Sequence, residues 1–330
     1  MSSMQHENSA VPPPVPVVPE VPPNRPGVGI FQNAEGLRAG WRLLLYLTLV
    51  VGFFLGLRIL LAPFWKAPPD TFSNQFLTEV IGFASSFAAA VLMSFLEHRP
   101  VGAYGLSVNS AFGKLFWQGS LAGLLEISIV VGLMSAFGGY SFGRLALHGA
   151  ELIRWAVLWA VCLLFVALFE EFLFRGYTLY TLTSGIGFWP AAILLSLLFG
   201  AVHLQNSGEG LIGVAGVFVV GLLWCFTVKR TGSLWFALGM HAAFDFGETF
   251  LYSVPDSGII FPGHLSDATI HGSAWLTGGT VGPEASVFDF VMLFLMFYVV
   301  HRLYPADRAT HQEHATLQRT SSEAKTNLTP

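Results

Sequence analysis

Two adjacent glutamates, Glu170 and Glu171, interrupt an otherwise apolar stretch over residues 155–180, and Arg175 follows the second glutamate by four positions. Ionised side chains at membrane depth cost roughly 2.5–3.5 kcal/mol each on the insertion scale. Three unpaired groups would therefore cost about 8–10 kcal/mol, a large part of the about 5–15 kcal/mol that stabilises a whole domain. We expect these groups to be paired, hydrated or used in function.

Helical spacing separates the roles of the two glutamates. Glu171 and Arg175 are four positions apart, so their side chains can pair on one face of a helix. Glu170 points about 100° away from Glu171, because successive helical residues differ by that angle. One glutamate can thus be held by the arginine while the other faces a cavity. A purely structural ion pair is the plainer interpretation of Glu171 and Arg175.

Two further apolar segments carry ionisable groups at helical spacing. Phe199 precedes His203 by four positions, and His241 precedes Asp245 by four positions, with Glu248 one turn further on. Carboxylates and imidazoles that share a hydrated cavity can exchange protons with water, which is the chemistry of general acid–base catalysis. Each residue taken singly also has a structural explanation. His203 can form an interhelical hydrogen bond, and His241 and Asp245 can form a static contact. Glu248 can lie at the membrane interface.

The composition indicates which elements position these residues. The chain is 53% hydrophobic and 11% charged, with a mean hydropathy of +0.61, and apolar runs long enough to cross a bilayer recur along it. The sequence therefore predicts an all-α fold, a polytopic transmembrane helical bundle. Its net charge of −4 and the absence of a Lys/Arg cluster give no indication of nucleic-acid binding. About eight spans are expected, over residues 41–64, 76–96, 114–137, 153–180, 189–205, 211–228, 233–252 and 286–303.

The remaining segments divide the chain into three parts. We expect a disordered Pro-rich tail over residues 1–37, a transmembrane domain over 38–304, and a second disordered tail over 305–330. The long connection from Ser253 to Ser286 contains no Lys or Arg and is a candidate lid. Small residues four positions apart, Gly52/Gly56 and Gly119/Gly123, predict close helix crossings.

The basic residues predict the orientation in the membrane. With the N-terminus inside and eight spans, eleven Lys and Arg residues fall on the inner side and three on the outer side. Cytoplasmic loops carry such an excess, so we expect both termini to be cytoplasmic in an integral, multi-pass protein of the cell membrane.

The three polar motifs, in this order and each on its own predicted transmembrane helix, resemble those of the CAAX-protease and bacteriocin-processing family (CPBP, or Abi). The pattern E-E-x-x-x-R, then F-x-x-x-H, then H-x-x-x-D matches at Glu170 to Arg175, Phe199 to His203 and His241 to Asp245. The resemblance covers residues 90–252. Glu97-His-Arg-Pro, followed by Gly105-Leu106, also resembles the family's segment after its second span.

This resemblance implies hydrolysis of a peptide bond within or at the membrane. It implies a catalytic set of Glu170, His203, His241 and Asp245, in which Glu170 is the general base and His203 its partner on the water. Glu171 and Arg175 match the supporting pair. The substrate would be a membrane-proximal peptide or protein tail at the lipid bilayer, and no residue indicates that it is prenylated.

The final motif position departs from the family pattern, in which an amide often stands where this chain has Asp245. An amide N–H can donate to a developing oxyanion, whereas a carboxylate repels it. Asp245 is either protonated by burial, or it orients His241 and leaves that ring as the oxyanion donor. We favour the second role.

A catalytic zinc is the alternative way to activate the water. Glu170, His203 and His241 are residues of the types that bind a catalytic Zn²⁺, with one coordination position left open for water. The sequence does not separate the metal-free and zinc mechanisms, and we favour the metal-free one on the family resemblance.

Two other functions use the same residues. A proton-coupled transporter would employ the buried glutamates and histidines as a relay. A non-catalytic immunity or scaffold protein would retain the bundle without needing them. The hypothesis that we favour is an intramembrane endopeptidase of the glutamic type.

Overall fold

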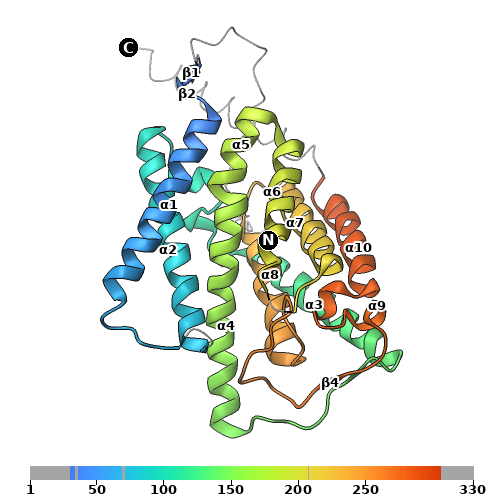
Figure 1. Cartoon of the computed structure of the whole chain (residues 1–330). Helices are drawn as coiled ribbons and strands as arrows, with labels where there is room; N and C mark the ends of the chain where they lie inside the picture. The colour runs from blue at the N-terminus through green and yellow to red at the C-terminus, as the bar shows by residue number, and fades with distance from the viewer. Residues whose placement is uncertain (1–29, 34–35, 69–70, 207, 306–330) are drawn as a thin grey trace, which may run out of the picture.

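The apolar segments of the chain fold into helices in the computed structural model (Figure 1). The structure describes residues 30–33, 36–68, 71–206 and 208–305. The predicted all-α membrane bundle is confirmed. Its main helices are α1 (Ala39–Leu61), α2 (Phe72–Leu96), α3 (Lys114–Ala136), α4 (Gly149–Glu171), α5 (Thr178–Ile186), α6 (Phe188–His203), α7 (Leu211–Thr231), α8 (Trp235–Phe246) and α10 (Val287–Leu303).

Every predicted span has a helical counterpart, but the helices differ in length. Within the described residues five helices are long and apolar enough to cross a membrane: α1, α2, α3, the continuous helix over 149–186, and α7. The other three predicted spans correspond to α6 with 16 residues, α8 with 12 and α10 with 17. The chain is an integral membrane protein.

Two helices carry an inserted π-helical turn at a polar motif, the first containing Arg175 and the second following Asp245. The π-helix η3 (Phe172–Tyr177) joins α4 to α5, and η4 (Gly247–Leu251) follows α8. Gly176 leaves the helical conformation, with φ −80° and ψ −116°. Such insertions are frequent at functional sites because they redirect side chains within a helix.

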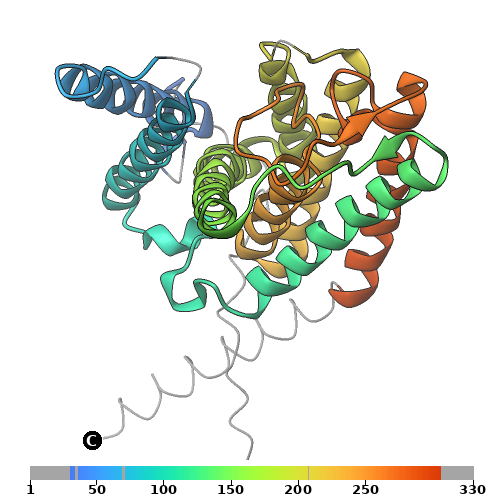
Figure 2. The same cartoon turned by 90° about the horizontal axis from the view of Figure 1, so that it is seen from below.

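The long helix formed by α4 and α5 stands between two groups of helices (Figures 1 and 2). On one side α2 packs against α1 and α4. On the other side α8 is enclosed by α3, α4 and α7, and α7 also contacts α6 and α10. The helix α8 therefore lies where the three polar motifs can meet.

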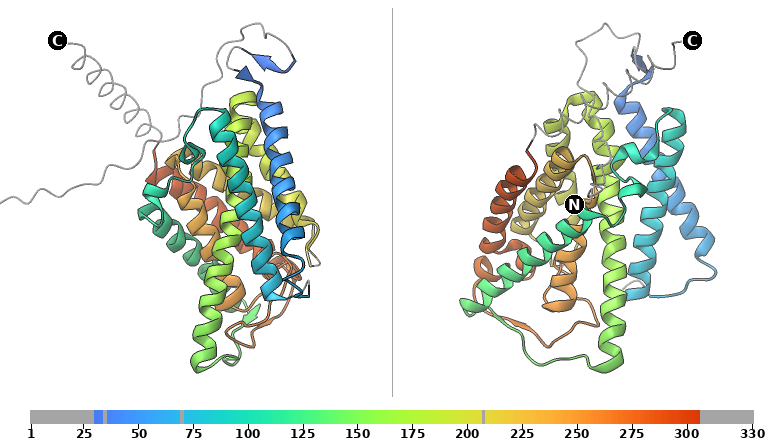
Figure 3. Two further views of the ribbon diagram at one scale, coloured as in Figure 1. Left: turned by 90° about the vertical axis from the view of Figure 1, so that its left-hand side faces the viewer. Right: turned by 180° about the vertical axis from the view of Figure 1, so that it is seen from behind.

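The crossing of α3 and α8 depends on glycine, as the spacing of Gly119 and Gly123 predicts. A Cβ added at Gly123 would lie 2.1 Å from the carbonyl oxygen of Met240, and one at Gly119 would be as close to the neighbouring turn of α8. Figure 3 shows α3 running obliquely across α8. The same prediction is wrong for Gly52 and Gly56, since nothing lies within 4 Å of either position in the described structure.

The predicted tails lie mostly outside the described residues. Residues 1–29 and 306–330 are in these undescribed parts, while β1 (Gln32–Asn33) and β2 (Gly36–Leu37) pair antiparallel before α1. Short 3₁₀ turns, η1 (Val101–Tyr104) and η2 (Val108–Ser110), connect α2 to α3.

The long connection from Ser253 to Ser286 is an ordered part of the fold. Its strand β4 (Thr269–Ile270) pairs antiparallel with β3 (Tyr140–Ser141), and it also contains α9 (Ala274–Thr277) and the 3₁₀ turn η5 (Pro283–Ala285). Its residues Asp256 and Glu284 reach the wall of the central cavity.

Candidate active site

The supporting pair of the first motif is completely buried. Nη1 of Arg175 donates to Oε1 of Glu171 across 3.0 Å, and both side chains have no exposed surface. The guanidinium lies 4.1 Å from the centre of the Phe199 ring and 5.2 Å from that of Trp224. A cation over an aromatic face is stabilised by the ring's quadrupole, so α6 and α7 help to hold the arginine. Gly221 makes room, because a Cβ there would lie 2.7 Å from Nη2 of Arg175.

Glu170 has the opposite environment. Its side chain retains 25% exposure, against none for Glu171, and it lines the central cavity. The one-residue offset on α4 therefore separates a glutamate tied to arginine from a glutamate that faces open space, as helical geometry requires.

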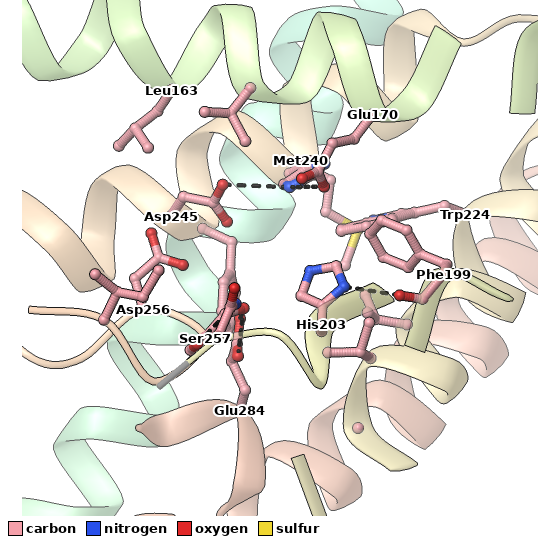
Figure 4. A pocket seen from close by; sticks show the side chains of 18 of the residues that line it. Leu163, Glu170, Phe199, His203, Trp224, Met240, Asp245, Asp256, Ser257 and Glu284 are labelled. Atoms are coloured by element: carbon pink, nitrogen blue, oxygen red, sulfur yellow. Dashed lines mark hydrogen bonds and ion pairs between the residues drawn. The ribbon is translucent and has the colours of Figure 1, made fainter. Parts of the chain in front are cut away.

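The central cavity has a volume of about 270 Å³ and lies among α2, α3, α4, α6, α7, α8, α10 and the Ser253–Ser286 connection. Glu170, His203, His241 and Asp245 all line it, so the structure brings residues from the three motifs together. Figure 4 shows this cavity, with Glu170, His203 and Asp245 around it. Neither Glu171 nor Arg175 lines it.

His241 is surrounded by carboxylates. Its Nδ1 lies 3.1 Å from Oε1 of Glu171, and its Nε2 lies 3.2 Å from Oδ2 of Asp245 and 3.7 Å from Oε2 of Glu170. Trp224 stacks on the ring, with centroids 4.3 Å apart and planes at 19°. The imidazole can donate to Glu171 and Asp245 together only when both ring nitrogens carry protons.

His203 ends α6 and has a defined tautomer. Its Nδ1 lies 2.7 Å from the carbonyl oxygen of Phe199, which can only accept, so Nδ1 must be the donor. In the neutral ring Nε2 is then an acceptor. Figure 4 shows the second ring nitrogen on the side away from Phe199. His203 therefore presents a lone pair that can accept a proton from water.

The residues named for zinc do not fit that metal in this arrangement. Both nitrogens of His241 face carboxylates, which leaves neither free to ligate. Within the described part of the chain, the group with three ligand atoms mutually within 4.8 Å is a different one: Asp245, Glu248 and Asp256.

Most of the acidic residues of the cavity lie outside the three motifs. Glu79, Glu126 and Asp289 lie within predicted spans and carried the same signal as Glu170, an ionisable group at membrane depth. They stand singly, without a neighbouring histidine or arginine motif. The cavity lining also includes Asp256 and Glu284 from the loop, and among the described residues it contains no Lys or Arg.

Glu248, which is expected at the membrane interface, is buried inside the protein. Its side chain is 0% exposed, because the Ser253–Ser286 connection folds back over η4. Burial also raises the pKa of Asp256 in that connection well above its usual range, and nearby Asp245 adds to the effect. The pKa of Glu284 is raised well above its usual range in the same way, with Asp256 adding. These carboxyls cannot all ionise without a compensating positive charge.

The part of the chain that carries the three motifs matches a known protein family. Residues 152–247 match the family model described as Type II CAAX prenyl endopeptidase Rce1-like. This segment is therefore similar to the CAAX-protease family. The match begins in α4 and ends at the start of η4, so it contains all three motifs. No curated protein and no solved structure matches the chain. The CAAX-protease match supports an intramembrane endopeptidase.

Proposed function

We propose that this protein hydrolyses a peptide bond of a membrane-proximal peptide or protein tail, with Glu170 as general base and His203 as its partner on the attacking water. One observation carries the proposal: Glu170 is the exposed member of the glutamate pair and lines the same cavity as His203. A general base must contact the water that it activates, and it must face a space that the substrate can enter. Glu171 cannot do this, because it is paired with Arg175 and fully buried.

The proposed reaction uses water as the nucleophile. A water in the cavity donates one hydrogen to the carboxylate of Glu170 and the other to the Nε2 lone pair of His203. As the water oxygen attacks the scissile carbonyl carbon, Glu170 takes its proton. When the tetrahedral intermediate breaks down, the C–N bond cleaves and Glu170 returns the proton to the leaving amine. The products are a carboxylic acid and an amine.

His241 acts in this proposal as a positioning residue. Its two ring nitrogens contact Glu171 and Asp245, so it joins α8 to α4 and holds Glu170 across 3.7 Å. The expected orienting contact of Asp245 is present. This contact occupies Nε2 of His241, so that nitrogen is not free to donate to an oxyanion. We therefore propose that His241 balances charge and does not stabilise the oxyanion. The buried cations Arg175 and protonated His241 balance Glu171 and Asp245, which leaves Glu170 as the carboxylate free to react.

The outer surface of the bundle supports a protein embedded in lipid. The helix α1 exposes many large apolar side chains, including Ile59 at 74% and Leu60 at 64%, as expected of a surface in contact with lipid. The distribution of Lys and Arg supports both termini on the cytoplasmic side of the cell membrane. We propose a peptide substrate without requiring a prenyl group on it.

Purified protein in detergent or nanodiscs tests the proposal with a library of peptides attached to a membrane anchor. We expect cleavage, and a loss of about 10²- to 10⁴-fold in kcat for Glu170→Gln and for His203→Ala. Glu151→Gln, an exposed glutamate paired with Arg154 at the start of α4, is the matched control and should retain activity.

The same variants separate the alternatives. Cleavage that survives Glu170→Gln would contradict the assigned base. If no peptide is cut but Glu170→Gln abolishes solute uptake in proteoliposomes, the residues form a transporter relay. If neither assay responds and the cellular phenotype of Glu170→Ala is unchanged, the protein is an immunity or scaffold protein.

A further inference from the structure

A group of three carboxylates lies at the loop side of the central cavity, and two of them, Glu248 and Asp256, are not used by the proposed hydrolysis. Asp245 belongs to α8, Glu248 to η4 and Asp256 to the Ser253–Ser286 connection. Each offers one oxygen, and these oxygens lie within 4.8 Å of one another. Figure 4 shows the carboxyl groups of Asp245 and Asp256 close together on the cavity wall.

Glu248 indicates that this group of carboxylates binds a ligand. Its side chain has no exposed surface, and neither of its carboxyl oxygens has a hydrogen-bond partner in the described structure. A buried carboxyl group without a partner costs several kcal/mol, so such groups are normally satisfied. A cation shared by the oxygens of Asp245, Glu248 and Asp256 would supply such a partner.

We propose that Asp245, Glu248 and Asp256 bind a divalent hard cation, for which Ca²⁺ is the probe ion. Two oxygens bound to one Ca²⁺ at about 2.4 Å can lie up to about 4.8 Å apart, and the three carboxylate oxygens, each within 4.8 Å of the others, meet this limit. The ligands are all oxygen, which favours Ca²⁺, Mg²⁺ or Mn²⁺ over Zn²⁺. Waters complete the coordination.

The neighbouring hydrogen bonds leave the required oxygens free. Oγ1 of Thr249 donates to Oδ2 of Asp256 across 2.8 Å, so Oδ1 of that residue is available. Oδ2 of Asp245 accepts from His241, which leaves its Oδ1. Glu284, whose carboxylate accepts from Ser257, adds negative charge nearby. The described residues of the cavity wall include acidic side chains and no Lys or Arg, and such a wall concentrates cations.

The bound cation would join the loop to the motif helix. Asp256 comes from the connection after Ser253, whereas Asp245 lies one helical turn from His241. Cation binding therefore fixes the loop over the cavity and holds the carboxylate that contacts His241. This role does not depend on whether Glu170 activates water. The experiment that tests it measures cation binding and not proteolysis.

Thermal unfolding of the full chain in detergent tests the site with Ca²⁺ as the probe. After removal of divalent ions, saturating Ca²⁺ should raise the Tm by at least about 3 °C. Glu248→Gln and Asp256→Asn should each raise the Ca²⁺ concentration for half of this shift about tenfold or more, because each removes a ligand charge. Glu151→Gln should behave as the unchanged protein. Tb³⁺ luminescence sensitised by tryptophan gives a second readout, since Trp159 lines the same cavity.

Each outcome decides the proposal. No Tm shift with Ca²⁺, Mg²⁺ or Mn²⁺, together with no metal in elemental analysis, would show that the group is neutralised by protons and would overturn it. A shift that persists unchanged in both variants would place the cation elsewhere and would overturn it equally. A larger shift with Mn²⁺ than with Ca²⁺, lost in the variants, would support the site and correct the ion. If Glu248→Gln does not fold, the partly exposed Asp256 allows Asp256→Asn to decide alone.

Discussion

Oε1 of Glu171 lies 3.1 Å from Nδ1 of His241, although the two residues are 70 positions apart in the chain. The same oxygen accepts from Nη1 of Arg175 at 3.0 Å. The first and third motifs are therefore joined by one fully buried carboxylate. This contact fixes α4 against α8, and with it the distance between Glu170 and the histidine.

The ion pair of Glu171 and Arg175 should behave as a unit. Arg175→Met leaves a buried, unbalanced carboxylate, and we expect a loss of about 3–5 kcal/mol in unfolding free energy. Adding Glu171→Gln to that variant should recover part of the loss. A double-mutant cycle measured by thermal or denaturant unfolding in detergent checks this. Strictly additive effects of the two substitutions would contradict coupling between them.

Gly123 should be intolerant of a single added methyl group. In Gly123→Ala the new Cβ meets the carbonyl oxygen of Met240 at 2.1 Å, which must push α3 away from α8 next to His241. We expect lower stability and lower peptidase activity. Gly132 lies on the same helix with nothing within 4 Å of its added Cβ. Gly132→Ala should therefore be neutral or stabilising by up to about 1 kcal/mol, since alanine favours helix. Equal Tm values for the two variants would contradict a close crossing.

Asp245 should act through His241 and not on the substrate. In Asp245→Asn the amide oxygen can still accept from Nε2, so we expect kcat to fall about tenfold or less, with KM unchanged. Asp245→Ala removes the acceptor and should lower kcat by about 10²-fold or more. Steady-state kinetics on a cleaved peptide measures both. Equal losses in the two variants would mean that the charge, and not the hydrogen bond, is what matters.

The sequence predicted the helical bundle well because apolar runs at membrane depth have few other structures. It also predicted the pairing of Glu171 with Arg175, a local relationship set by helical periodicity alone. It did not predict the environment of Glu248, because that depends on where a long loop returns. The roles of Glu126 and Asp289 were missed for a related reason. They come from α3 and α10, and only packing brings single carboxyls from distant helices to one cavity.

The arrangement of His241 makes a specific prediction about zinc. A zinc ligand must offer a nitrogen lone pair, but Nδ1 and Nε2 of His241 lie 3.1 Å and 3.2 Å from carboxylate oxygens. Glu170 and His203 alone would give zinc two protein ligands. We therefore expect peptide cleavage to survive 1,10-phenanthroline, a chelator that removes zinc and leaves Ca²⁺ in place. Activity lost on chelation and restored by zinc, with zinc found in the purified protein, would mean that His241 turns to ligate the metal. The loss of that zinc in His241→Ala would then locate the site.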